Sequence, residues 1–205
     1  MGGMETNLQG RLRNTSLPFN HGLLPMFEAV VNSIHAIEES GLSSNQGNIS
    51  IEIVRSAQEP LDFKTKPKKR GPDAYEDILG FKINDNGVGF NDQNLKSFLT
   101  LDSDYKADKG GRGIGRLLWL KAFKKAKISS VYKDGEDKLK LRTFTFTAAS
   151  GVSEQEEREV QHDTQRLTCI HLDDFDKRYR EASSKTTQTI ANSLFEHCLW
   201  YFVRE

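Results

Sequence analysis

The order of the periodic segments most constrains how this chain can fold. Apolar residues recur with a helical period from Leu23 to Ile37, before a segment from Ile49 to Ile53 that alternates like a half-buried strand. Most other strand patterns come late, and those from Ala126 to Lys133 and from Lys138 to Thr147 flank an Asp-Gly turn typical of a hairpin. Early helices and late hairpins favour an α+β two-layer sandwich over a doubly wound parallel sheet.

No internal repeat or linker divides the chain, so we predict one domain at 22–205 after an N-terminal segment at 1–21. The apolar end of the last helix, within 183–205, leads us to expect a further downstream region in the parent protein. The remaining predictions are strands at 78–85, 158–161 and 166–172, helices at 91–101, 114–123 and 186–203, and an exposed loop at 56–77.

Composition narrows the classes of function. The 29 basic and 29 acidic residues cancel, which gives no support for a nucleic-acid partner. Two cysteines without metal-like spacing fit a reducing compartment. No apolar run is long enough to span a membrane and the start lacks a signal peptide, so we expect a cytoplasmic protein with no membrane partner.

The first candidate motif is a pair of polar residues on the early helix. Glu28 and Asn32 are one turn apart and share a face that differs from the apolar stripe of Phe27, Val31 and Ile34. The amide oxygen of Asn can ligate Mg²⁺, and the carboxylate of Glu can deprotonate a water molecule. Taken alone, such a pair is more often an ordinary solvated one.

The second motif follows the predicted strand at 78–85. The strand ends in Asp85, and Gly87 and Gly89 then allow the backbone to approach a ligand closely. A carboxylate held there can accept a hydrogen bond from an exocyclic amine such as that of adenine. A tight turn with a capping Asp is the alternative interpretation.

The third motif is a glycine-rich stretch that opens the helix at 114–123. Such a stretch aims free backbone amides at an anion, although glycine-rich loops alone are poorly specific. It is not a Walker A loop, because its Lys precedes the glycines and no Lys-Ser/Thr pair follows. We expect the basic residues after it, beginning with Arg116, to form the exposed face of the helix. The motif comprises Lys109, Gly110, Gly111, Arg112, Gly113, Ile114 and Gly115.

The order and spacing of the three motifs resemble the GHKL superfamily of ATPases, which includes gyrase B, a heat-shock chaperone, histidine kinases and MutL. The resemblance covers about residues 22–172. It implies the Bergerat fold, a two-layer α/β sandwich whose mixed, mostly antiparallel sheet is covered on one face by helices. A late-strand Thr of the family is matched by Thr168.

By this resemblance the ligands are ATP and Mg²⁺. Asp85 would bind the adenine amino group with support from Thr168, Asn32 would hold Mg²⁺, and Glu28 would be the general base. Residues 91–112 would form a lid. The other implied nucleotide contacts are Gly87, Gly89, Lys109, Gly111, Arg112, Gly113, Ile114 and Gly115.

Two positions depart from the family pattern. His35 stands where the helix motif usually carries Asp, and we interpret it as a structural histidine. Leu167 replaces the usual Gly before the late Thr, which makes Thr168 the least secure of the transferred residues.

The implied function is ATP binding with slow hydrolysis by the ATPase domain of a larger protein, coupled to lid closure. Partners would be downstream domains of the same protein and a second copy in an ATP-dependent homodimer. A non-hydrolysing ATP sensor is the first alternative, since its binding residues would be the same. A histidine kinase domain is the second, and only about 20 residues precede the helix motif, too few for a phosphoacceptor hairpin.

Overall fold

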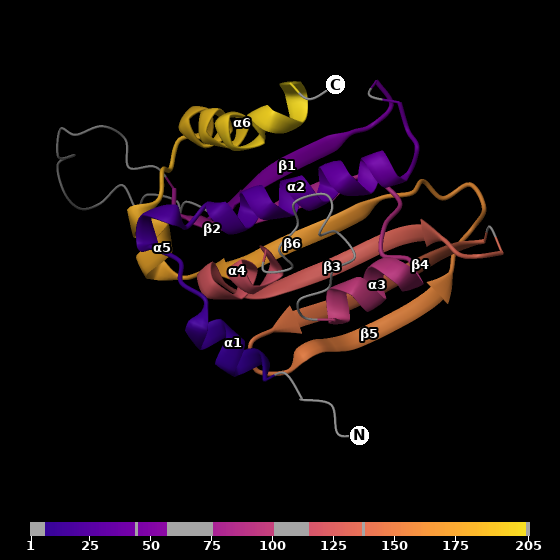
Figure 1. Cartoon of the computed structure of the whole chain (residues 1–205), viewed down its shortest axis with the longest axis horizontal. Coiled ribbons are helices and arrows are strands. Elements are labelled where there is room, and N and C mark those ends of the chain that lie inside the picture. Colours follow the sequence, from indigo (N-terminus) through magenta and orange to yellow (C-terminus); the bar gives the residue numbers. More distant parts are fainter. Residues whose placement is uncertain (1–6, 44, 57–75, 101–114, 137, 204–205) are drawn as a thin grey trace, which may run out of the picture.

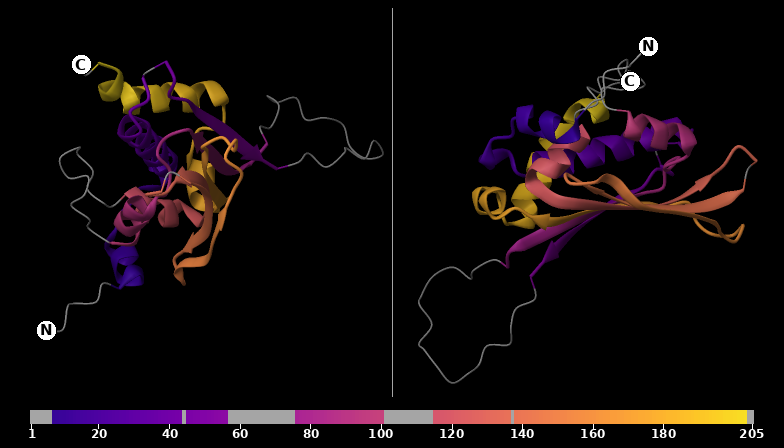
Figure 2. Two further views of the ribbon diagram at one scale, coloured as in Figure 1. Left: turned by 90° about the vertical axis from the view of Figure 1, so that its right-hand side faces the viewer. Right: turned by 90° about the horizontal axis from the view of Figure 1, so that it is seen from below.

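The computed structural model describes residues 7–43, 45–56, 76–100, 115–136 and 138–203. These residues form a six-stranded antiparallel sheet with helices on one face, which confirms the predicted α+β class (Figures 1 and 2). Five predicted site residues lie outside the described residues, as do most of the predicted loop at 56–77 and part of the predicted lid. These five are Lys109, Gly111, Arg112, Gly113 and Ile114.

The strands run in the order β1-β2-β6-β3-β4-β5. Every pairing among the described strands is antiparallel, so the expectation of a mixed sheet is wrong. The helical connection between β2 and β3 gives these two strands the same direction, but β6 inserts between them and separates the parallel pair. The strands are β1 (Ile49–Arg55), β2 (Ile78–Asp85), β3 (Phe123–Lys133), β4 (Leu139–Thr147), β5 (Gly151–Glu159) and β6 (Thr168–Phe175).

The helices α2, α3 and α4 cover the same face of the sheet, and α6 packs beside α2 (Figures 1 and 2). Four of the helices agree with the predicted ones to within a few residues, whereas α1, η1 and α5 were not predicted. The helical elements are α1 (Leu8–Asn14), the 3-10 turn η1 (Phe19–His21), α2 (Leu24–Glu39), α3 (Asp92–Leu99), α4 (Gly115–Ala122), α5 (Lys177–Ala182) and α6 (Thr187–Val203).

Local sequence signals account for the bounds of α2 and α3. Pro25 stands in the first turn of α2, where its missing amide hydrogen has no intrahelical acceptor to lose. Gly41 follows the helix with a φ of +70°, which is the left-handed conformation that commonly ends helices. The side chain of Asn91 accepts a hydrogen bond from the backbone amide of Asn94 at 2.8 Å and thereby caps α3.

The core lies between the sheet and its covering helices. Phe81 and Ile83 alternate inward from β2 and are fully buried, as is Leu172 on β6. Trp119 of α4 is buried above them, and Phe123 at the start of β3 is also enclosed. Burying these large side chains supplies most of the free energy that holds the helical layer on the sheet.

A row of polar side chains crosses the helix-covered face of the sheet. Cross-strand register aligns Asp85 with Thr168, Thr168 with Ser130, Ser130 with Arg142, and Arg142 with Glu157. The first four are buried, with exposed fractions of 0–3%. Because buried polar groups are stable only when they are hydrogen-bonded, this polar row marks a constrained part of the interior.

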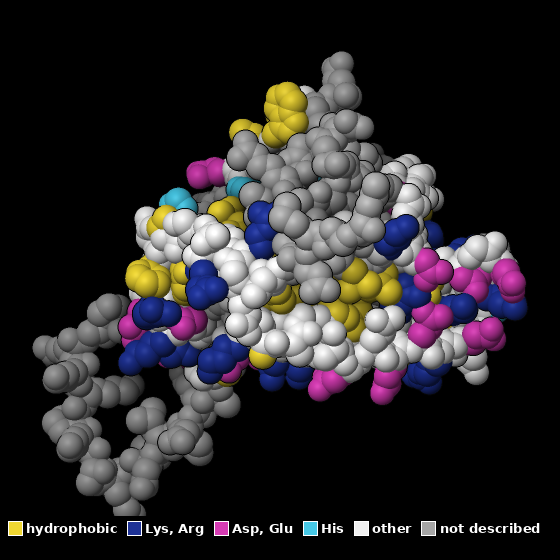
Figure 3. Space-filling view, turned by 60° about the horizontal axis from the view of Figure 1, so that its bottom comes forward, with side chains coloured by type: hydrophobic (Ala, Val, Ile, Leu, Met, Phe, Trp, Pro, Cys, Tyr) yellow, Lys and Arg dark blue, Asp and Glu magenta, His cyan; other side chains and the backbone are white. Residues whose placement is uncertain are grey.

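The visible surface mixes both signs of charge. Figure 3 shows Lys and Arg side chains interspersed with Asp and Glu over one face of the described residues. Among the helices that the structure describes, none is both long and apolar enough to cross a membrane.

Candidate functional site

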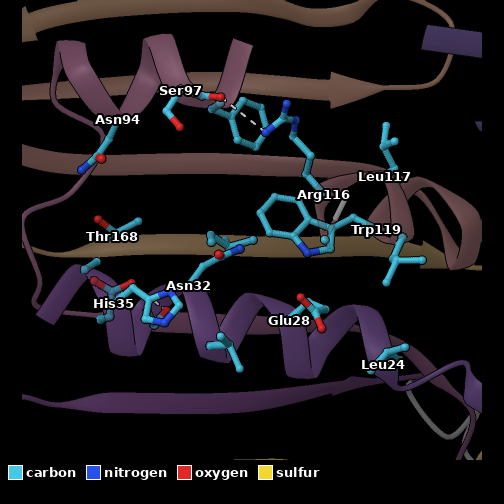
Figure 4. A pocket seen from close by; sticks show the side chains of 18 of the residues that line it. Leu24, Glu28, Asn32, His35, Asn94, Ser97, Arg116, Leu117, Trp119 and Thr168 are labelled. Carbon is cyan, nitrogen blue, oxygen red and sulfur yellow. Dashed lines mark hydrogen bonds between the residues drawn. The ribbon is translucent and has the colours of Figure 1, made fainter. Parts of the chain in front are cut away.

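A cavity of about 910 Å³ lies between α2, α3 and α4 above the sheet (Figure 4). Its size is within the usual range for small-molecule sites. Glu28 and Asn32 line it from α2, Asp85 from β2 and Thr168 from β6. Four residues predicted from separate motifs therefore line one cavity.

The carboxylate of Asp85 is held in a fixed orientation. Ser33 of α2 donates its hydroxyl hydrogen to Oδ2 at 2.8 Å, and the backbone amide of Gly87 donates to Oδ1 at 3.0 Å. Asp85 is 3% exposed, so water does not compete strongly for these bonds. A carboxylate fixed by two donors still has lone pairs that can accept a hydrogen bond from a ligand.

Gly87 and Gly89 allow the backbone to approach other parts of the protein closely. A Cβ atom on Gly87 would lie 2.5 Å from the carbonyl carbon of Ala36, so the loop packs directly on α2. Gly89 has a φ of +75°, and its Cβ would lie 2.6 Å from Oγ of Ser130. The close approaches that the structure shows are to α2 and β3, and they set the position of the loop beside the cavity. The predicted close approach to a ligand stays a prediction.

Hydrogen bonds from neighbouring strands anchor the loop after Gly89. Oγ of Ser130 accepts a hydrogen bond from the backbone amide of Phe90 at 2.9 Å and lies 2.8 Å from Oγ1 of Thr168. Arg142 donates from Nη1 to the carbonyl oxygen of Phe90 at 2.7 Å. The polar row thus fixes both the amide and the carbonyl of one residue at the cavity wall.

Replacing Ser130 with Ala is expected to lower the free energy of unfolding by about 1–3 kcal/mol. The change leaves the amide of Phe90 and the hydroxyl of Thr168 without this partner in a buried setting. Urea unfolding followed by circular dichroism measures the loss. Ser129→Ala is the matched control, because Ser129 is exposed on the opposite face of β3 and should change stability by less than about 0.5 kcal/mol. Equal stability of the two variants would contradict this account.

Glu28 lies away from the end of the cavity that holds Thr168, the register partner of Asp85 (Figure 4). A Cβ atom on Gly115 would lie 2.9 Å from Oε2 of Glu28, so the carboxylate lies against the first residue of α4. Oε1 is 3.9 Å from Nε2 of His197 on α6. Burial raises the pKa of Glu28, and the nearby His197 partly opposes this effect. A carboxyl group with a raised pKa beside a cavity suits a general base.

Asn32 points into the cavity between Glu28 and the end that holds Thr168 (Figure 4). Among the described residues, no group of three or more His, Cys, Asp and Glu side chains could hold a metal ion. An amide oxygen alone is a weak ligand, but Mg²⁺ in nucleotide sites commonly takes one or two protein ligands and completes its shell with phosphates and water.

Several cavity residues were not predicted as site residues, and three of them carry polar groups of interest. Arg116 of α4 lines the cavity, so the expectation that it lies on an exposed helix face is wrong. His197 and Tyr201 line it from α6, one turn apart on the face that contacts α2. The ring of Tyr201 meets that of His35 edge to face at a centroid distance of 5.4 Å. The position of Arg116 directly after the glycine motif was a usable signal, whereas nothing in the sequence indicated which face of α6 turns inward.

The structure brings together all seven of the predicted site residues that it describes. Comparison with known proteins gives no assignment, because no protein-family model and no curated protein matches the chain. The residues that surround or support the cavity are Glu28, Asn32, Asp85, Gly87, Gly89, Gly115 and Thr168.

Proposed function

We propose that this chain binds ATP with Mg²⁺ and hydrolyses it slowly, through a GHKL-type site on a Bergerat fold. One observation carries the proposal. Asp85 and Thr168 lie in direct register at one end of the cavity, and Glu28 and Asn32 extend along α2 toward the other. A nucleotide in this cavity would meet these residues in a matching order. The carboxylate that binds adenine would come first, and the metal ligand and the general base for hydrolysis would follow toward the phosphates.

Adenine recognition would rest on Asp85. Its carboxylate accepts hydrogen bonds only, and it is already oriented by Ser33 and Gly87. The exocyclic amine of adenine donates to such a group, whereas guanine presents a carbonyl oxygen at the same ring position. An unpaired oxygen facing the buried carboxylate would cost binding free energy, so the site should select ATP over GTP.

Hydrolysis would depend on Glu28. Its carboxylate can accept a proton from a water molecule as that water attacks the terminal phosphate. Its location against Gly115 places it beside the N-terminus of α4, where backbone amides favour negative charge. The same location is therefore suitable for the phosphates.

The fit of Mg²⁺ depends on the donor set along α2. Asn32 supplies one amide oxygen from a side chain that points into the cavity. When bound there with ATP, the ion would neutralise charge on the phosphate oxygens. Asn32 would hold the ion on the side of the cavity that also carries Glu28, so that metal ligand and base share one rigid helix.

Isothermal titration calorimetry with Mg²⁺-ATP and Mg²⁺-GTP tests the proposal. We expect saturable binding of ATP and none of GTP. Asp85→Asn should weaken ATP binding by about 10- to 100-fold, because each carboxylate oxygen accepts a hydrogen bond from one donor and the change replaces one of these oxygens with an NH₂ donor. Asp163→Asn, at an exposed position, is the control and should bind ATP like the wild type.

Three results would be decisive. Equal affinities for ATP and GTP, or an unchanged ATP affinity in Asp85→Asn, would contradict adenine recognition by this residue. Absence of ATP binding by the folded wild-type chain would reject the proposal. ATP binding without measurable phosphate release would leave the sensor alternative as the function.

A further inference from the structure

The guanidinium group of Arg116 lies in an environment that the roles proposed for the other cavity residues do not explain. Arg116 is the second residue of α4, and its side chain extends across the top of the cavity toward α3, on the side opposite α2, which carries Glu28 and Asn32 (Figure 4). The end of the cavity that holds Glu28 and Arg116 lies away from the end that holds Thr168.

All described contacts of this guanidinium group are with neutral groups. Nη2 donates to the carbonyl oxygen of Thr100 at 2.6 Å, and Nη1 lies 3.4 Å from the carbonyl oxygen of Ser97. The group also lies 5.4 Å from the ring centroid of Phe98. These carbonyl oxygens belong to the C-terminal end of α3, where helices have acceptors without intrahelical partners.

A half-buried cation that has no anionic partner among the described residues is incompletely solvated, which is costly. Burial lowers the pKa of Arg116 to about 10, which leaves the group protonated at neutral pH but shows that its solvation is incomplete. Two neutral carbonyl oxygens compensate for less of that loss than an anion would, because hydrogen bonds between charged partners are about twice as strong as neutral ones. The site is therefore poised to accept a negatively charged group.

We propose that Arg116 binds the terminal phosphate of the nucleoside triphosphate and so distinguishes ATP from ADP. The inference rests on the proposed function and adds a specificity-determining residue to its site. The planar guanidinium can donate two parallel hydrogen bonds to phosphate oxygens, which an amine cannot do. Its place opposite Glu28 would set the terminal phosphate between a cation and the base.

A purely structural role is the competing account. In that role Arg116 only caps α3 through Ser97 and Thr100. Its loss would destabilise the helix, and it would change the affinities for ADP and ATP by the same factor. The two accounts differ in one measurable quantity, which is the ratio of the dissociation constants for ADP and ATP.

Calorimetric titration of Mg²⁺-ATP and Mg²⁺-ADP into Arg116→Met measures this ratio. We expect ATP binding to weaken by about 10- to 100-fold and ADP binding by less than about threefold. Arg116→Lys should fall between wild type and Arg116→Met for ATP, since it keeps the charge but not the planar fork. Arg158→Met, an exposed position on β5, is the control and should leave both affinities unchanged.

A second measurement uses the wild-type chain and does not depend on folding of the variants. Phenylglyoxal modifies exposed guanidinium groups, and mass spectrometry of peptides quantifies modification at Arg116. ATP should protect this residue and ADP should not. The inference would be overturned if ATP and ADP protected Arg116 equally, or if Arg116→Met weakened the binding of both nucleotides by the same factor. Failure of wild type to bind either nucleotide would instead reject the proposed function together with this inference.

Discussion

Replacing Glu28 with Gln is expected to lower the steady-state rate of ATP hydrolysis by about 10²- to 10⁴-fold. The amide has the same shape as the carboxylate but cannot accept a proton from the attacking water. Affinity for Mg²⁺-ATP should stay within about threefold of wild type, since the change removes a transition-state interaction. Phosphate release measured with a coupled assay, together with calorimetry, separates the two effects.

Glu38→Gln is the matched control, because Glu38 is an exposed carboxylate near the end of the same helix. The Glu38→Gln variant should hydrolyse ATP at the same steady-state rate as the wild type. A Glu28→Gln rate within a factor of two of the control would show that this carboxylate is not the base.

The pH dependence offers an independent check on the same residue. Because burial raises the pKa of Glu28, the carboxylate becomes protonated at a higher pH than an ordinary Glu, whose pKa is 4.5. Protonated Glu28 cannot accept a proton from water. The wild-type rate should therefore fall as pH decreases through a midpoint above 4.5, and this acid limb should be absent from the residual activity of Glu28→Gln.

Replacing Arg142 with Met is expected to lower the free energy of unfolding by about 3 kcal/mol. The side chain is 4% exposed, and it bonds to the carbonyl of Phe90 and to the carboxylates of Asp92 and Glu157. Removing one partner of a buried ion pair typically costs about 3–5 kcal/mol. The lower end of this range of costs applies here, because the side chain of Glu157 is 33% exposed and water can hydrate its carboxylate after Arg142 is removed.

Urea unfolding followed by tryptophan fluorescence measures this loss of stability. Arg178→Met is the control, since the side chain of Arg178 is 69% exposed in its ion pair with Asp176 and should contribute at most about 1 kcal/mol. If both variants lost the same stability, the polar row would not be a main stabilising feature of the sheet.

Regular periodicity made much of this fold predictable. The strand Ile78–Asp85 was predicted with the bounds that the structure has, because buried residues alternate along it and a turn signal follows. By contrast, β5 was predicted only as a short strand at 158–161. Its residues are half-buried or exposed throughout Gly151–Glu159, as befits an edge strand, so it has no apolar alternation to detect.

The contacts that complete the site were less predictable than its motifs. Motif order identified Glu28, Asn32 and Asp85, which the structure brings to one cavity. Alternation in β4 places Arg142 on the inward face with Phe144 and Phe146, but an arginine is rarely assigned to a core position from sequence. Strand order set the remaining contacts, and a single sequence does not encode that order in any local pattern.

The central position of β6 has a consequence for biosynthesis. This strand lies between β2 and β3 but follows all the other strands along the chain. A growing chain that has not reached Thr168 can assemble only a β1–β2 piece and a β3–β4–β5 piece, each with an unpaired edge. These contacts of high sequence separation are slow to form, because the loop must close first. The nascent sheet is therefore incomplete until Thr168–Phe175 has been synthesised, and its unpaired edges need protection from aggregation until then.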